Sequence, residues 1–139
     1  MIKFVSNSIE DTENFAKELA KKITPPETIL LFGELGAGKT AFTRGFLDGL
    51  NYAGRVSSPT FAIMNQYNVK DFTVNHFDLY RIESGEELYE IGFDDFLDGN
   101  YINIIEWPDN FLDFMPKDPI VVKLEKTGEN TRQIEVEGI

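Results

Sequence analysis

The sequence predicts an α/β fold of three layers, with helices around a mostly parallel sheet to which antiparallel hairpins are added. Two apolar runs, 28–32 and 101–105, have the length and composition of strands buried on both faces. The first third of the chain reads as strand, helix, strand, glycine-rich loop and helix, which is the order expected for such layers. At 139 residues the chain fits one domain, 1–139.

The N-terminal elements follow from spacing and from residues that begin or end helices. Residues 2–5 read as a short strand. Ser8 has the residue type and place of a helix cap, and early acidic residues follow it. Apolar residues then recur at helical spacing: Phe15, Leu19 and Ile23. Pro25 and Pro26 end this helix, and an apolar stripe over 39–50 predicts a second one after the loop.

The second half predicts a strand pair, two short helices and a closing hairpin around the second apolar run. The strand pair is expected at 61–69 and 72–77, and the two short helices at 86–91 and 94–97. The closing hairpin is expected at 119–125 and 132–136.

Composition and charge exclude several classes of protein. The 24 acidic residues outnumber the 13 basic ones and give a net charge of −11, so we expect no strong direct binding to nucleic acid. No apolar run reaches the roughly 18 residues of a membrane span, and the N-terminus does not resemble a signal peptide. The chain has no cysteine, which excludes disulfides and thiolate metal sites. A cytoplasmic protein that does not meet the membrane is the simplest expectation.

The loop at 33–40 matches the phosphate-binding pattern G-x-x-x-x-G-K-[ST]. Glycines allow left-handed backbone conformations that turn successive N–H groups toward one anion, and the following helix adds its N-terminal dipole. Lys39 can reach the β- and γ-phosphates, and the Thr40 hydroxyl can ligate Mg²⁺. We therefore expect ATP and Mg²⁺ to be held by Gly33, Glu34, Leu35, Gly36, Ala37, Gly38, Lys39 and Thr40.

Two carboxylates stand where a phosphate-loop site needs them. Asp78 ends the strand-like run 72–77, and Glu106 ends the run 101–105. The carboxyl ends of parallel strands face the ligand crevice, so either acid could hold Mg²⁺ or orient the attacking water. The alternative is that both are solvated acids at strand ends.

Four short motifs in order closely resemble the bacterial TsaE family, formerly YjeE. They are the loop 33–40, Ser58-Pro59-Thr60-Phe61, His76-Phe77-Asp78-Leu79-Tyr80-Arg81, and Ile105-Glu106-Trp107. The resemblance covers nearly the whole chain. It implies a P-loop ATPase subunit of the machinery that makes threonylcarbamoyladenosine at position 37 of tRNA. In that family the subunit acts with TsaD and TsaB, and it uses ATP to sustain turnover while TsaD performs the transfer.

The resemblance also implies roles for individual residues. It assigns contact with Mg²⁺ to Thr40 and Glu106, with Asp78 as a second functional carboxylate. The segment around Thr60 is switch-like in the family, although Pro59 also allows a purely structural turn. The catalytic residues we expect are Lys39, Thr60, Asp78 and Glu106.

Family position suggests two further nucleotide contacts, Arg132 on the closing hairpin and Thr12 on the adenine side. The remaining motif residues stay open. His76 fits a structural histidine better than a catalytic one, and Trp107 fits a partner contact as well as a hydrophobic plug. Tyr80 and Arg81 could brace Asp78 or face TsaD.

Other classes of protein share the phosphate loop. A GTPase switch would carry a base-reading motif of the form Asn/Thr-Lys-x-Asp, which this sequence lacks. A small-molecule kinase needs an arginine-bearing lid, for which four arginines in 139 residues leave little room. A scaffold that binds ATP without hydrolysing it is a third alternative. None of the four arginines stands at an obvious arginine-finger position, so we expect slow hydrolysis that the partner complex accelerates.

Overall fold

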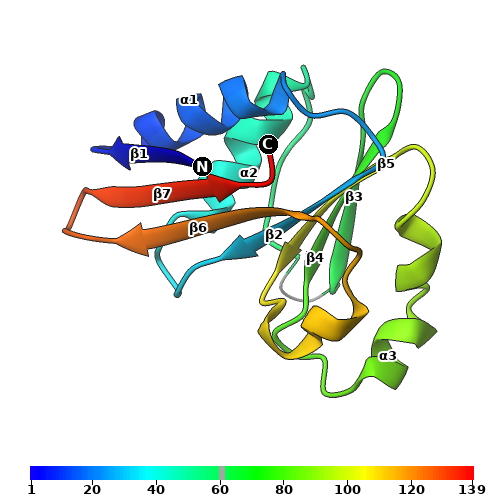
Figure 1. Cartoon of the computed structure of the whole chain (residues 1–139). Helices are drawn as coiled ribbons and strands as arrows, with labels where there is room; N and C mark the ends of the chain where they lie inside the picture. Colours follow the sequence, from blue (N-terminus) through cyan, green and yellow to red (C-terminus); the bar gives the residue numbers. More distant parts are fainter. Residues whose placement is uncertain (60–61) are drawn as a thin grey trace.

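The computed structural model describes residues 1–59 and 62–139 and places seven strands in one mixed sheet (Figure 1). In chain order the elements are β1 (Ile2–Ser6), α1 (Ile9–Ala20), β2 (Glu27–Phe32), α2 (Lys39–Gly49), β3 (Met64–Asn68), β4 (Thr73–Asp78), α3 (Gly85–Glu90), η1 (Phe93–Phe96), β5 (Tyr101–Glu106), η2 (Asp109–Phe114), β6 (Ile120–Lys126) and β7 (Arg132–Glu137). The labels η mark short 3₁₀ helices.

The centre of the sheet is parallel and both ends are antiparallel. The strand order is β1-β7-β6-β2-β5-β4-β3. β2 runs parallel to β5 and β6, and β4 runs parallel to β5. β3 joins β4 as an antiparallel hairpin, and β7 pairs antiparallel with both β6 and β1. The predicted α/β class, with a parallel centre and added hairpins, is confirmed.

Two apolar cores separate three layers. The larger core lies between the sheet and the pair α1 and α2, where Phe42 and Phe46 of α2 are fully buried. The smaller core lies on the opposite face beneath α3, η1 and η2, and Phe77 and Phe93 pack edge-to-face within it. Figure 1 shows α1 and α2 on one side of the sheet and α3 on the other. The site described below lies on the α2 side.

The predicted elements are present, and the differences have local causes. Ser8 caps α1 as expected, because its side chain accepts a hydrogen bond from the Asp11 amide. The predicted strand 61–69 is shorter as β3, because Ile63 has a left-handed φ of 64° and the strand begins after it. Residues 93–96 form a 3₁₀ helix, and η2 was not predicted. No helix in the described part of the chain is long and apolar enough to cross a membrane.

A close backbone approach joins α1 to α2. A Cβ atom added at Gly45 would lie 2.6 Å from the Glu13 Cα, closer than real atoms approach. A glycine at this position lets the two helices cross with their backbones in contact. The crossing fixes α2, and with it the loop that precedes α2.

A row of amide side chains crosses the sheet on the α3 side, and two of them, Asn75 and Asn103, are buried. Asn75 of β4 donates to the Asn103 side chain of β5 at 2.9 Å and accepts from Gln66 of β3 at 3.0 Å. Asn103 in turn donates to the Phe96 carbonyl. The buried amides of Asn75 and Asn103 are thus satisfied by hydrogen bonds, as buried polar groups must be.

Candidate functional site

The glycine-rich loop between β2 and α2 contains two residues with left-handed backbone conformations. Gly36 and Gly38 have left-handed φ angles of 85° and 103°, which side chains with a Cβ rarely tolerate. The Ala37 amide donates to the Glu34 carbonyl at 3.0 Å, and the first bond of α2 runs from the Phe42 amide to the Gly38 carbonyl. The amides of residues 39–41 therefore precede the helical ladder and are available to an anion.

This loop forms one wall of a cavity of about 770 Å³, within the usual size of a ligand site. The other walls come from the ends of β4 and β5, the segment before β3, the start of α1 and the closing hairpin. The lining residues are Ile9, Glu34, Leu35, Gly36, Gly38, Lys39, Thr40, Ala41, Arg44, Ser58, Ile63, Asp78, Tyr80, Arg81, Glu106, Trp107 and Arg132.

Lys39, the first residue of α2, is buried between a carboxylate and an aromatic ring. Only 7% of its surface is exposed, and its Nζ lies 3.7 Å from Glu106 Oε1 and 3.9 Å from the centre of the Trp107 ring. Tyr80 packs edge-on against the same tryptophan at 5.1 Å. Burial lowers the pKa of the Lys39 ammonium, and the nearby carboxylates of Glu106 and Asp78 partly oppose that shift.

Asp78 and Glu106 are neighbours across the parallel pair β4 and β5, because they are partners in its register. Glu106 is 5% exposed, whereas Asp78 is half-buried. The Asp78 Oδ1 accepts a hydrogen bond from the Tyr80 amide at 3.0 Å, which holds that carboxylate at the turn after β4. Trp107 directly follows Glu106 with a left-handed φ of 57°, uncommon for a residue with a side chain.

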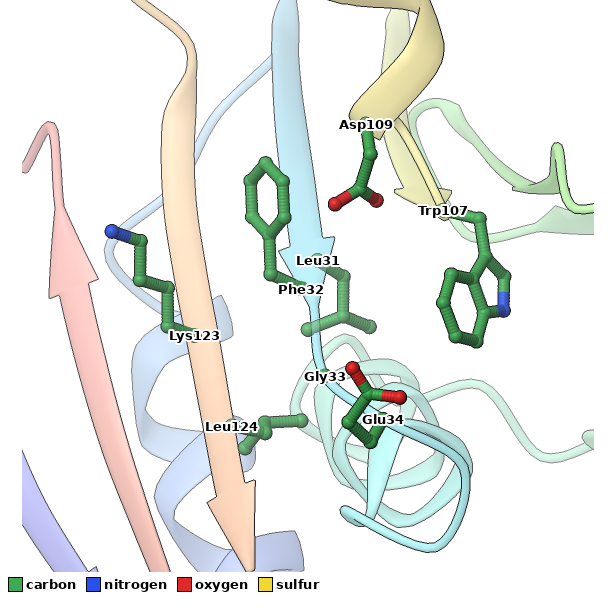
Figure 2. A pocket seen from close by; sticks show the side chains of 8 residues that line it. All are labelled: Leu31, Phe32, Gly33, Glu34, Trp107, Asp109, Lys123 and Leu124. Atoms are coloured by element: carbon green, nitrogen blue, oxygen red, sulfur yellow. The ribbon is translucent and has the colours of Figure 1, made fainter.

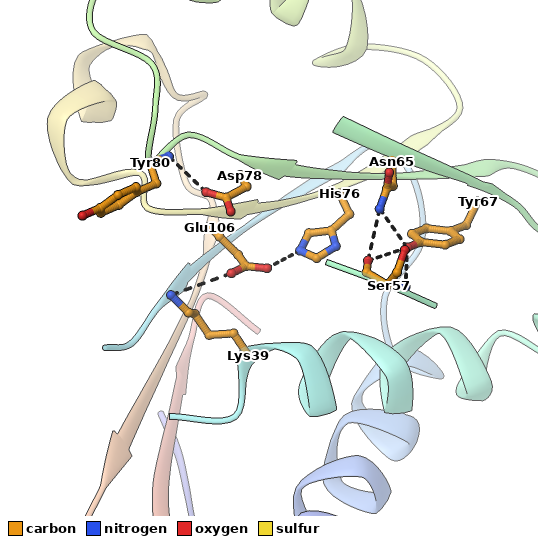
Figure 3. A network of polar contacts seen from close by, with 8 residues as sticks. All are labelled: Lys39, Ser57, Asn65, Tyr67, His76, Asp78, Tyr80 and Glu106. Carbon is orange, nitrogen blue, oxygen red and sulfur yellow. Dashed lines mark hydrogen bonds and ion pairs between the residues drawn. The ribbon is translucent and has the colours of Figure 1, made fainter. Parts of the chain in front are cut away.

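Figure 3 shows Lys39, Glu106 and His76 in a row, so that the two oxygens of Glu106 face two different partners. His76 is 1% exposed, and its Nε2 lies 2.5 Å from Glu106 Oε2. On the far side of His76, the side chains of Asn65 and Tyr67 both bond the Ser57 carbonyl.

Arg132 connects the closing hairpin to the phosphate loop. Its Nη2 donates to the Gly36 carbonyl at 3.0 Å. Its Nη1 donates to carbonyls of the hairpin turn, those of Gly128, Glu129 and Thr131. The guanidinium group therefore fixes the loop against β7 at the rim of the cavity.

A second, smaller cavity of about 260 Å³ lies beside the start of the loop, among the side chains drawn in Figure 2. It shares Glu34 and Trp107 with the large cavity, and Asp109 and Lys123 add charged groups to its wall. Trp107 thus separates two hollows at the carboxyl ends of the central strands.

Comparison with known proteins identifies the family. The family model described as "Threonylcarbamoyl adenosine biosynthesis protein TsaE" matches residues 6–134. The chain belongs to the TsaE family.

Curated TsaE relatives from several bacteria share most of the chain. A protein of Rickettsia felis named tRNA threonylcarbamoyladenosine biosynthesis protein TsaE is 40% identical over 131 residues, which cover 92% of this chain and 75% of the relative. The TsaE of Bacillus subtilis is 34% identical, over 90% of this chain and 78% of the relative. The TsaE of Haemophilus influenzae is 36% identical, over 86% of this chain and 76% of the relative. The crystal structure of Bacillus subtilis YdiB superposes with a TM-score of 0.81 at 29% identity, covering 96% of this chain and 82% of that one.

Most of the residues predicted for the TsaE site share the large cavity. Its wall includes Glu34, Leu35, Gly36, Gly38, Lys39, Thr40, Asp78, Glu106 and Arg132. Gly33 lines the smaller cavity instead, and the side chain of Ala37, also a loop residue, is buried in the larger core. Thr12 is buried, and its hydroxyl pairs with that of Ser6 at 2.7 Å, so its predicted adenine contact stays a prediction. Thr60 lies outside the described residues.

Sequence reasoning missed several residues of the cavity wall, among them Arg44, Ile9 and Ile63. Arg44 lies one helical turn after Thr40, and that spacing could have placed it beside the site. It bonds Glu13 of α1 at 3.3 Å. Ile9 and Ile63 carried no such signal, since only the folded chain brings their segments to the loop.

Proposed function

We propose that the chain is a Mg²⁺-dependent ATPase that acts with TsaD and TsaB in the formation of threonylcarbamoyladenosine in tRNA. The observation that carries the ATPase proposal is the pairing of two features across one cavity. On one wall are the amides of the loop and the Lys39 ammonium, and facing them are the register partners Asp78 and Glu106. Donors for phosphate oxygens thus oppose groups that can orient water.

The oxygen ligands that line the cavity suit a Mg²⁺ ion whose remaining ligands are phosphate oxygens and water. Among residues 1–59 and 62–139, no group of three or more His, Cys, Asp or Glu side chains could hold a metal alone. Mg²⁺ in nucleotide sites is held by one or two carboxylates together with substrate phosphates and water. Thr40, Asp78 and Glu106 line the same cavity and supply a hydroxyl and two carboxylates of that kind. The chemistry supplied by the bound ion is neutralisation of charge on phosphate oxygens.

The residues of the chain have separate tasks in this proposal. The loop amides and Lys39 bind and orient the phosphates, and Trp107 covers Lys39 so that water is kept from its ammonium group. Glu106, in a buried position, is suited to orient the attacking water and accept its proton. The preference for ATP over GTP rests on the missing base-reading motif.

The role in tRNA modification rests on the family and on charge. A chain with a net charge of −11 has little attraction for RNA phosphates, so we assign the contact with tRNA to TsaD and TsaB.

Phosphate release by a Glu106→Gln variant tests the proposed ATPase. Glutamine keeps the shape of the side chain and an oxygen that can accept from His76, but it removes the carboxylate. We expect phosphate release to fall by about a hundredfold or more, while ATP still binds and the folded spectrum is unchanged. A Glu90→Ala variant at the exposed end of α3 is the control and should release phosphate as the wild type does. Wild-type release by Glu106→Gln would contradict the assignment, and binding without release even with TsaD and TsaB would favour the scaffold alternative.

A further inference from the structure

His76 is the buried group next to the site that the proposed chemistry leaves without a task. It lies on β4 two residues before Asp78, so both side chains face α2. Its register partner is Ile104, two residues before Glu106, which brings the imidazole beside the glutamate across the parallel pair. A histidine that only filled space would not need a polar partner 2.5 Å away in the sheet interior.

The hydrogen bond has one consistent assignment. The Glu106 carboxylate offers only acceptors, so the proton between the two groups belongs to His76 Nε2. His76 Nδ1 is buried and has no hydrogen-bond partner among the residues that the structure describes. A bare lone pair fits that position better than an N–H group, which would lose its hydrogen bond to water without replacement. The imidazole of His76 therefore donates to Glu106 through Nε2 alone.

The two oxygens of Glu106 are held unequally. Oε2 accepts the short bond from His76, whereas Oε1 meets Lys39 Nζ only at 3.7 Å. A lysine that turns toward phosphate would release Oε1, and His76 would still hold Oε2. The carboxylate plane is then set by a side chain that is itself locked in the sheet.

We propose that His76 is a positioning residue that fixes the Glu106 carboxylate with Oε1 toward the cavity. This inference rests on the proposed function, because it concerns the same carboxylate. Residues of this kind hydrogen-bond a carboxylate that holds a metal or orients water. Their removal typically lowers the affinity for the metal by 10- to 100-fold.

The test compares ATP affinity with and without magnesium in His76→Gln and His76→Asn. Both variants place an amide in the strand, but the longer glutamine can bring its N–H group toward Glu106 and the shorter asparagine cannot. Magnesium should raise the ATP affinity of the wild type, and we expect this gain to be about tenfold smaller in His76→Asn. With a chelator present, the ATP affinity of His76→Asn should stay within about twofold of the wild-type value. His76→Gln should keep most of the gain.

Asn75→Leu is the matched control for lost stability. Asn75 precedes His76 on the same strand, is equally buried and faces the opposite core, where it bonds Asn103. Its replacement should lower the melting temperature without changing the gain from magnesium. The positioning role is overturned if His76→Asn keeps the full gain, or if Asn75→Leu loses as much. A wild-type protein that binds no ATP at all would instead refute the proposed function itself.

Discussion

Lys39 shows how the site handles a buried charge. Its ammonium group lies between Glu106 and the face of Trp107, so a carboxylate and a π-system offset part of the cost of burial. Burial still dominates and lowers the lysine pKa. An incoming phosphate would find the cation already desolvated, and a desolvated charge interacts more strongly.

The lowered pKa of Lys39 predicts how ATP affinity depends on pH. A phosphate group is attracted by the protonated lysine, so affinity should fall as pH rises through a pKa below the ordinary value of 10.5. A Lys39→Arg variant stays charged throughout, so its affinity, although weaker at neutral pH, should hardly change between pH 8 and about 10. Titrations of ATP at several pH values would measure both curves. Parallel curves for the two proteins would contradict the assigned contact.

Site residues could be predicted from the sequence where a short, contiguous stretch of chain carries the signal. Lys39 and Thr40 came from a contiguous pattern, and Asp78 and Glu106 from their places at the ends of strand-like runs. The bond from Arg132 to Gly36 joins residues 96 positions apart, and no local pattern carries such a contact. The link between His76 and Glu106 likewise depends on the register of β4 on β5, which only the folded sheet defines.

At the scale of elements, the position of the phosphate loop depends on the crossing of α1 and α2. The backbones meet where Gly45 faces Glu13, and Arg44 adds an ion pair to Glu13 at 3.3 Å beside that contact. The sequence predicted both helices from their apolar spacing, but it gave no sign that Gly45 is one of the points where they touch. Propensity alone would treat this glycine as a weak point of α2.

Gly45→Ala therefore tests the crossing, because two effects of opposite sign compete there. Alanine should favour the helix by about 1 kcal/mol. The added methyl group would meet the Glu13 backbone, which cannot rotate away, and overpacking typically costs about 1–3 kcal/mol or more. We expect a net loss in the free energy of unfolding, measured by urea denaturation. Glu18→Ala on the exposed face of α1 should change it by less than about 0.5 kcal/mol. A stabilised Gly45→Ala protein would show that the helices do not approach so closely.

For the whole molecule, charge and exposed aromatics indicate dependence on partners. The net charge of −11 disfavours direct contact with tRNA. The guanidinium groups of Arg44 and Arg132 line the cavity but are held by Glu13 and by backbone carbonyls. At the cavity rim, Tyr80 is 70% exposed, and tyrosine is enriched at protein–protein interfaces.

We accordingly predict slow hydrolysis by the chain alone and faster hydrolysis with TsaD and TsaB. A Tyr80→Ser variant should lose much of the stimulation, because the exposed tyrosine ring of the wild type would meet the partner at the rim. Tyr89→Ser is the control, since Tyr89 is 72% exposed on α3, outside the cavity lining. Phosphate release measured with and without the partners would decide. A fast lone enzyme, or equal losses in both variants, would contradict the prediction.

Calorimetric titration of magnesium ATP into the folded protein tests the claim that the loop and Lys39 enclose the phosphates of ATP. We predict saturable heat with one site per chain. In a Lys39→Ala protein that still folds, we predict that most of this affinity is lost. No heat with the wild-type protein, or unchanged affinity in Lys39→Ala, would contradict the claim.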